Sequence, residues 1–252
     1  MRTANEVRLI PVYFADEILA GDDLAQKLAS ELRHQKLYLQ KNDVVVVKHK
    51  IISKAEGQIV ALNDVRPRRS ALAWRHKYGG DARVLELAMR EAKRIVRRKN
   101  GVLITETRHG FVCANSGVDA SNVDGGRSAV LLPRDPDRSA ARLRAGIKQL
   151  FGVTVAVIVS DSFGRPWREG LVDVAIGVAG LKPIADFRGI CDSHDYTLRG
   201  TVEAVADELA CAAGLVCGKL NRAPVCVIRG FKYVSGKGSA RELVRRKNDL
   251  FR

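Results

Sequence analysis

The apolar run Val153–Val159 is the feature that most constrains the fold of this chain. A strand of this kind is buried on both faces, so it needs a sheet with other elements packed on each side. The run leads into the segment SDSFGRPWR, in which Asp161 is expected at the end of the buried strand. Ser162, Arg165 and Arg168 follow it. Ligand sites in sheet proteins gather at strand ends, so this loop is the first candidate site.

A second candidate loop closes the stretch Gly101–Asn122. Residues 102–105 are expected as a strand, with a turn at residues 109–110 and a second short strand over 111–114. The next eight residues crowd carboxylate, amide and hydroxyl oxygens together, including Asp119 and Asn122. Such oxygens are the ligands that Mg²⁺ takes, although Asp and Asn also build ordinary turns. Two carboxylate loops in one chain indicate a metal site better than either loop alone.

The remaining elements alternate between strands and helices. An Asp-capped helix is expected to start at residues 21–23, and another to start at Asp137 with Ala140, Leu143, Ile147 and Leu150 facing inward. Residues 63–80 are expected as a basic loop or short helix. The other expected strands are 7–13, 44–52, 130–132 and 224–229, and the other expected helices are 81–98, 201–216 and a basic one at the end of the chain.

The length of 252 residues, 46% of them hydrophobic, allows a substantial core in one large domain or two small ones. The five cysteines form no CxxC pair, which is typical of a reduced, cytosolic protein without a disulfide framework or a zinc site. No signal peptide pattern opens the chain, and no apolar run has the length of a membrane span. A cytoplasmic protein without a membrane partner is therefore expected.

The charge is strongly positive, with 43 Lys and Arg against 28 Asp and Glu, for a net charge of +15. Such a balance indicates polyanionic partners, which include nucleic acid, an anionic membrane and phosphate-rich substrates. The basic residues at the end of the expected helix 81–98 suit the negative end of a helix and need no nucleic acid. Aromatic residues amount to only 6%, so the stacking platforms of nucleic-acid-binding proteins are missing.

Several nucleotide and nucleophile motifs are absent from the sequence. There is no GxxxxGK[ST], so the segment Gly236-Lys237-Gly238 is not a P-loop, and no GxGxxG follows an expected strand. No GxSxG supplies a nucleophile elbow. Catalysis by a protein nucleophile is therefore unsupported, whereas metal-assisted phosphate chemistry stays open.

Three segments together resemble one known family. They are IISKAEG at residues 51–57, HGFVCAN with GVDASNV over residues 109–123, and SDSFGR at residues 160–165. The chain is identified as a member of the coenzyme F420-0:L-glutamate ligase family, with a likeness that runs from about residue 10 to residue 230. The resemblance implies an α/β (α+β) fold of mixed sheets with packed helices. It also implies an intertwined homodimer and a single ligase-type domain over residues 1–252, with two possible subdomains and the site between them.

The resemblance implies a GTP-dependent ligase that adds L-glutamate through a γ-linkage to the deazaflavin coenzyme F420-0 by way of an acyl phosphate. It further implies two Mg²⁺ or Mn²⁺ ions per site, with K⁺ as an additional candidate. The residues that it places in the site fall into four groups: metal ligands Asp119, Asp161 and Ser162; catalytic residues Asp119, Asp161 and Lys54; nucleotide contacts Lys48, His49, Lys54, Asn122 and Lys219; and substrate contacts Arg165 and Arg168.

Two departures from the family pattern occur. Phe14-Ala15-Asp16 replaces a Gly-Leu-Pro loop that many relatives have after the first strand, and Lys219 stands where many place Gln or Glu as a further metal ligand. A lysine repels a cation, so either the second metal is held differently or Lys219 contacts phosphate. The competing interpretations are a basic nucleic-acid-binding protein and a related ligase with another acid acceptor. For the ligase, the expected partners are GTP, L-glutamate, F420-0 and a second copy, without a specific nucleic acid.

Overall fold

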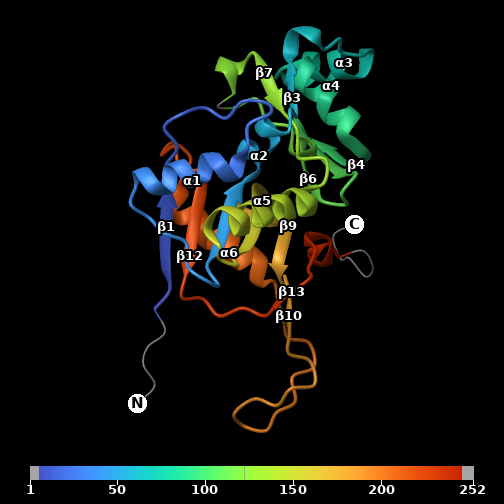
Figure 1. Cartoon of the computed structure of the whole chain (residues 1–252). Coiled ribbons are helices and arrows are strands. Elements are labelled where there is room, and N and C mark those ends of the chain that lie inside the picture. Colours follow the sequence, from blue (N-terminus) through green and yellow to red (C-terminus); the bar gives the residue numbers. More distant parts are fainter. Residues whose placement is uncertain (1–5, 122, 246–252) are drawn as a thin grey trace.

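The computed structural model describes residues 6–121 and 123–245, and its main body is a six-stranded mixed sheet (Figure 1). In spatial order the strands are β1 (Arg8–Val12), β12 (Val225–Arg229), β2 (Val44–Lys48), β8 (Ala156–Arg165), β9 (Arg168–Leu181) and β13 (Ser235–Gly236). The central pair β2 and β8 is parallel, and the other neighbours are antiparallel. This mixed sheet with packed helices confirms the expected fold class.

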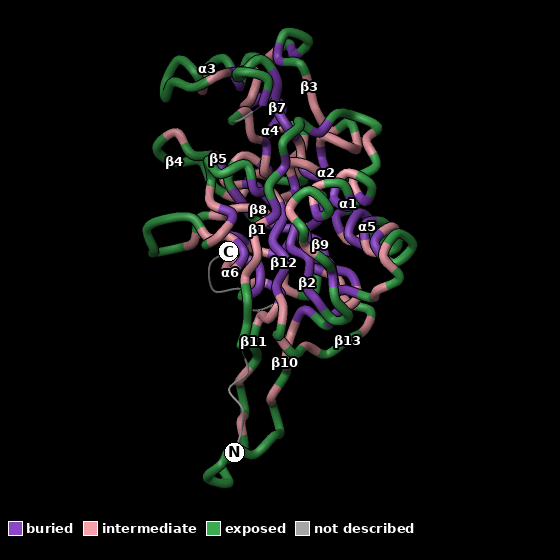
Figure 2. The backbone as a smooth tube through the Cα atoms, turned by 60° about the vertical axis from the view of Figure 1, so that its left-hand side comes forward, coloured by how far each residue is buried: buried purple, intermediate pink, exposed green. Residues whose placement is uncertain are grey.

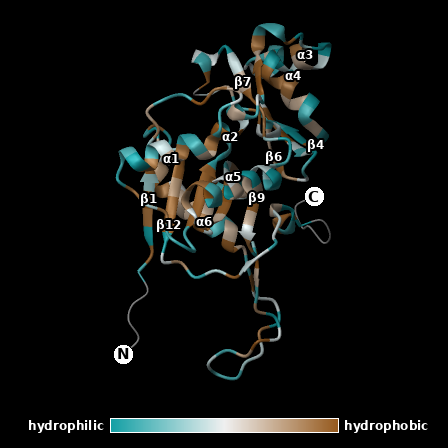
Figure 3. Cartoon of the chain, viewed as in Figure 1, coloured by the Kyte–Doolittle hydropathy of each residue, from teal (hydrophilic) through white to brown (hydrophobic). Residues whose placement is uncertain are grey.

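Helices cover both faces of the main sheet. In Figure 2, α1 (Leu24–His34) and α5 (Pro136–Phe151) lie on one side of the sheet, and α6 (Val205–Cys217) lies on the other. Residues 44–47 of β2 and 156–159 of β8 are therefore at most 2% exposed, which confirms the burial expected of the apolar run except for Val153 and Thr154. In Figure 3 the strands of this sheet are largely hydrophobic, whereas the helices that cover it carry many hydrophilic residues. None of the helices within the described residues has the length and apolar character to span a bilayer.

A smaller part of the chain, approximately residues 59–131, lies above the main sheet in Figure 1 and has hydrophobic clusters of its own. It contains the pair β3 (Ile59–Ala61) and β7 (Ser128–Val130), the sheet of β4 (Ala92–Lys99), β5 (Val102–Thr107) and β6 (Val112–Ala114), and the helices α3 (Arg69–Tyr78) and α4 (Ala82–Glu91). At the opposite end, β10 (Ala185–Asp186) and β11 (Val202–Glu203) form the base of an arm that projects from the body (Figure 2).

The strand expected over residues 44–52 is wrong beyond Lys48, because the chain turns there into the helix α2 (His49–Ala55). The buried residues of α2 are His49, Ile52 and Ser53, which are spaced three and four apart and so form one helical face. The two isoleucines after the valine run suggested a longer strand. Their burial instead follows the helical period, which places Lys54 in the last turn of a helix.

The helix expected over residues 81–98 is right only as far as Glu91. Residues 92–99 form β4, which pairs with β5 in an antiparallel hairpin. Asn100 and Gly101 connect the two strands, both with positive φ, as a two-residue hairpin turn requires. The basic residues of this segment lie on a largely exposed strand, so the interpretation that they complement a helix end is wrong.

Other expected boundaries shift by a few residues. Asp135, and not Asp137, caps α5, and Leu150 at the other end of that helix is exposed. Helix α6 begins at Val205, and β8 begins at Ala156 but continues to Arg165. Near the end of the chain, the described residues form only a short 3₁₀ helix, Ala240–Leu243, and the rest of the expected basic helix lies outside them.

The close approach of α5 to β9 depends on Gly177, since a Cβ atom there would collide with the backbone of Pro136. We expect Gly177→Ala to lower the free energy of unfolding by about 1–3 kcal/mol, because the helix would have to move off the sheet. Gly164→Ala is the matched control, because its nearest neighbour, Leu171 Cδ2, would lie 3.8 Å from the new methyl group. Urea denaturation of both variants measures the difference, and equal stabilities would contradict the packing argument.

Candidate active site

A cavity of about 730 Å³ opens where β2 ends, next to residues 160–162 of β8 and beside the loop that follows β6. Because β2 and β8 are parallel, with Lys48 opposite Ser160, the carboxyl end of β2 lies beside the middle of β8, which continues to Arg165. The residues that line the cavity come from both parts of the fold. Those with carboxylate, cationic, imidazole or hydroxyl side chains are Asp16, Glu17, Lys48, His49, Lys50, Lys54, Asp119, Ser121, Asp124, Ser160, Asp161, Ser162, Lys219 and Arg222.

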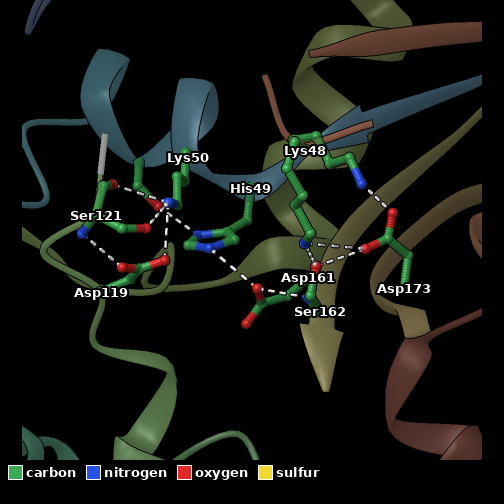
Figure 4. Close-up of polar contacts among 10 residues, drawn as sticks. Lys48, His49, Lys50, Asp119, Ser121, Asp161, Ser162 and Asp173 are labelled. Carbon is green, nitrogen blue, oxygen red and sulfur yellow. Dashed lines mark hydrogen bonds and ion pairs between the residues drawn. The ribbon is translucent and has the colours of Figure 1, made fainter. Parts of the chain in front are cut away.

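The junction between β2 and α2 directs three consecutive basic residues to three different carboxylates (Figure 4). Lys48 Nζ pairs with Asp173, His49 Nε2 lies 3.3 Å from Asp161 Oδ1, and Lys50 Nζ lies 2.8 Å from Asp119 Oδ2. The other ring nitrogen of His49 lies 3.3 Å from the hydroxyl of Ser53, one turn along α2. The change from strand to helix at this point is what sends the side chains in different directions.

Asp161 lies within β8 rather than at its end, which corrects the expected position. The register of β8 and β9 shifts next to Ser160, and a bulge of this kind can redirect side chains near a site. Asp161 Oδ1 accepts a hydrogen bond of 2.7 Å from the backbone N–H of Ser162. Its other oxygen, Oδ2, has no polar contact with the described residues. This carboxylate therefore keeps one free oxygen at the cavity.

Asp119 is held in the loop beside β7, where its backbone forms a bridge with Val130. Its Oδ1 accepts a hydrogen bond of 2.7 Å from the N–H of Ser121, and Lys50 also binds the hydroxyl of Ser121 at 3.1 Å. Burial alone would raise the pKa of Asp119, but the donors on Lys50 and Ser121 outweigh it and hold this pKa below its usual range. Asp119 is therefore a carboxylate at neutral pH.

Asp173 on β9 lies directly behind the cavity lining, where it contacts three lining side chains, and sequence analysis missed it. Its side chain is only 5% exposed and directly faces Ser162 across the strand pair, where the hydroxyl of Ser162 donates a hydrogen bond of 2.6 Å. Lys48 and Lys219 contribute two ammonium groups to the same carboxylate. Lys50 was missed as well. The one available signal for Asp173 was a lone acidic residue inside the apolar run of residues 171–180.

The structure places seven predicted site residues on the cavity: Lys48, His49, Lys54, Asp119, Asp161, Ser162 and Lys219. Lys54 Nζ pairs with Glu17 at 2.6 Å, and Lys219 Nζ contacts the hydroxyl of Ser162. Arg165 and Arg168 are not among the lining residues, and Arg165 donates a hydrogen bond to the carbonyl of Glu169 near the start of β9. Asn122 lies outside the described residues.

The donor atoms at the cavity decide whether it can hold a divalent cation. Within residues 6–121 and 123–245, no three or more His, Cys, Asp and Glu side chains are grouped so as to hold a metal by themselves. Mg²⁺, however, uses only one or two carboxylates when substrate phosphates and water complete its shell. Asp161, with its free oxygen, and Asp119 provide such carboxylates, and the buried hydroxyl of Ser160 has no hydrogen-bond partner in the described part of the chain. These residues fit a cation that binds together with a phosphate ligand.

The cavity also carries permanent positive charge that suits such a ligand. Lysines 48, 50, 54 and 219 and Arg222 approach it from two segments, residues 48–54 and residues 219–222. Charged groups converging on one concave surface raise the local concentration of an oppositely charged ligand. Five carboxylates line the same cavity, so the lining suits a phosphate ligand that binds together with a cation.

Comparison with known proteins gives consistent results. Residues 14–230 match the family model described as F420-0:Gamma-glutamyl ligase. The chain is 42% identical over 250 residues to the coenzyme F420:L-glutamate ligase of Methanothermobacter thermautotrophicus, which covers 98% of this chain and 99% of that relative. It is 41% identical over 252 residues to the protein of the same name from Methanopyrus kandleri, with 98% of each chain covered. A third relative of that name, from Methanocaldococcus jannaschii, is 42% identical over 216 residues, or 85% of this chain and 86% of its own.

Proposed function

The chain belongs to the F420-0:gamma-glutamyl ligase family, and we propose that it joins L-glutamate through a γ-linkage to the deazaflavin coenzyme precursor F420-0, with GTP as the energy source. The observation that carries this proposal is one cavity that contains the carboxylates of Asp119 and Asp161 together with lysines at positions 48, 50, 54 and 219. Carboxylates for a cation and ammonium groups for phosphates are the requirements of nucleotide-driven ligation.

The chemistry requires activation of the acceptor. An amide does not form readily from a free carboxylate, because the leaving oxygen is poor, whereas an acyl phosphate is a good acyl donor. In the proposed reaction, the terminal carboxylate of F420-0 attacks the γ-phosphate of GTP and releases GDP. The amine of L-glutamate then attacks the acyl carbon, loses a proton and displaces inorganic phosphate. Both steps move negative charge between phosphate oxygens and need fixed positive groups nearby.

Residues of this chain supply those groups. Lys50 and Lys54 reach the cavity from the same face of α2, four residues apart, and Lys219 reaches it from the segment after α6. We assign them to the phosphates of the nucleotide. The partner of Lys54 is the exposed carboxylate of Glu17, which a phosphate group can replace. Mg²⁺ or Mn²⁺, held by Asp161 and Asp119, would supply the divalent charge that neutralises the phosphate oxygens during transfer.

Two further expectations stay predictions. Arg165 and Arg168 lie on the turn of the β8–β9 hairpin, outside the cavity lining, so contact with the acceptor would require the substrate to extend beyond the cavity.

A homodimer would account for the projecting arm, on which Ile190, Tyr196 and Val202 are exposed. A two-stranded hairpin is marginally stable by itself in water, so this arm gains from a partner surface.

The test of the function is incubation of the protein with F420-0, L-glutamate, GTP and Mn²⁺, followed by mass spectrometry of the coenzyme. We expect F420-0 to gain glutamate in amounts that match the GDP formed, and we expect neither product when GTP is omitted. A well-folded protein that leaves F420-0 unchanged would contradict the proposal. Glutamate added to a different carboxylic acid under the same conditions would instead identify another acceptor.

A further inference from the structure

The three aspartates labelled in Figure 4, Asp119 and Asp161 on the cavity and Asp173 beside it, differ in the groups that neutralise them. Asp119 pairs with the ammonium group of Lys50, and Asp173 pairs with two ammonium groups. Asp161 has only the imidazole of His49 beside it, and its Oδ2 has no polar contact within the described residues. The oxygen that is most available to an incoming cation therefore belongs to Asp161.

The carboxylate of Asp173 is already neutralised by cationic groups of the protein. Its buried carboxylate requires neutralisation, because an unpaired charge in a dry environment is strongly unfavourable. Lys48 Nζ pairs with Oδ2, while Oδ1 accepts the hydroxyl proton of Ser162 at 2.6 Å and has Lys219 Nζ at 4.0 Å. Together, these groups occupy both oxygens. A metal ion that approached Asp173 would have to displace an ammonium group.

The ammonium group of Lys219 also contacts the hydroxyl oxygen of Ser162. Since the hydroxyl proton of Ser162 points to Asp173, its lone pairs face the ammonium group of Lys219, which contacts this oxygen. The Lys219 side chain is 64% exposed, so its ammonium group is both held by the protein and open to the cavity. A lysine ammonium is a compact, positive, three-proton donor that can contact a phosphate at the same time.

We propose that the ammonium group of Lys219, positioned by Ser162 and Asp173, takes the place of a second metal ion, so that each active site binds one divalent cation with its nucleotide. This inference rests on the proposed function and defines the cation requirement of the same site. The single divalent cation binds at Asp161, with Asp119 as the other carboxylate of the site. Lys219 provides the second positive group to the nucleotide phosphates, and Ser162 holds Lys219 rather than the metal.

The experiment counts Mn²⁺ in the complex of the whole protein with a GTP analogue whose β,γ-bridging oxygen is replaced by nitrogen. Electron paramagnetic resonance and elemental analysis of the same sample give the number and the spacing of the ions. For the unaltered protein, we expect one Mn²⁺ for each bound nucleotide and the six-line spectrum of an isolated ion. Two spin-coupled Mn²⁺ ions for each nucleotide would overturn the inference and leave the proposed function standing.

Lys219→Gln removes the ammonium group and adds an amide oxygen. We expect this variant to bind a second Mn²⁺, with a spin-coupled spectrum, and to bind the analogue about tenfold to a hundredfold more weakly when only one equivalent of Mn²⁺ is present. Lys219→Arg is the matched control, because it retains the charge, and it should retain one Mn²⁺. A Lys219→Gln variant that still binds one ion with unchanged affinity would overturn the inference. An unaltered protein that binds no nucleotide would overturn both the inference and the proposed function.

Discussion

Asp161→Asn is expected to lower ligase turnover by about a hundredfold to a thousandfold while the fold survives. Mutations that remove one preorganised electrostatic contact to a reacting centre have effects of this size. The asparagine oxygen can still accept the hydrogen bond from the N–H of Ser162, so the local backbone keeps its partner. What is lost is the negative charge beside His49 and, with it, the free carboxylate oxygen at the cavity. Steady-state rates of glutamate addition measure the effect.

The control for this variant is Asp64→Asn, which makes the same chemical change at an exposed position outside the cavity. Circular dichroism and thermal denaturation show whether each variant is folded. Near-normal turnover in a well-folded Asp161→Asn protein would show that this carboxylate is not part of the catalytic site.

Asp119→Asn is expected to abolish the protection against heat that GTP and Mn²⁺ give together. A ligand at a hundred times its dissociation constant stabilises a protein by about 2.7 kcal/mol. For a chain of this size, that corresponds to a shift of roughly 5–11 °C in the melting temperature. Asp119 is ionised at neutral pH, because Lys50 and Ser121 hold its pKa low, and the amide of asparagine cannot replace that charge. Differential scanning fluorimetry with the nitrogen-bridged GTP analogue measures the shift.

The readout for Asp119 separates binding from catalysis, since no reaction occurs in the assay. Removing Mn²⁺ from the unaltered protein should reduce the protection in the same way as the substitution does. Full protection of Asp119→Asn by the analogue and Mn²⁺ would contradict a role for this carboxylate in holding the metal–nucleotide complex.

Local sequence patterns predicted the centre of the fold but not its junctions. The apolar run of β8 and the capped helix α1 are as expected, because burial and capping are encoded within a few adjacent residues. Residues 44–55 were harder, since four valines followed by two isoleucines suit a strand. Tertiary packing decides this case, and the buried residues of α2 follow the helical period only from His49 onward.

The hairpin of β4 and β5 could have been found from the sequence. Asn100-Gly101 is a strong signal for a two-residue turn, and the β-branched pair Ile95-Val96 precedes it. Helical spacing in the residues before Glu91 extended the expected helix too far. The error also affected the interpretation of the charge, because it assigned the basic residues of β4 to the end of a helix, whereas α4 ends at Glu91.

The candidate site shows the same division between local and long-range information. Asp119 and Asp161 were found because each follows or ends an apolar segment with oxygen-rich neighbours. Asp173 was not, since its role depends on the register that places it opposite Ser162 and on lysines 125 and 46 residues away in the sequence, Lys48 and Lys219. Such contacts arise only once the sheet has formed.

The most direct test of the central claim, that the cavity activates a carboxylate by phosphorylation, follows oxygen-18 from the terminal carboxylate of F420-0. The labelled coenzyme is incubated with the protein, L-glutamate, GTP and Mn²⁺, and the released inorganic phosphate is examined by mass spectrometry. Formation of an acyl phosphate predicts one labelled oxygen in the phosphate for each glutamate added. Glutamate addition that releases unlabelled phosphate would contradict the account.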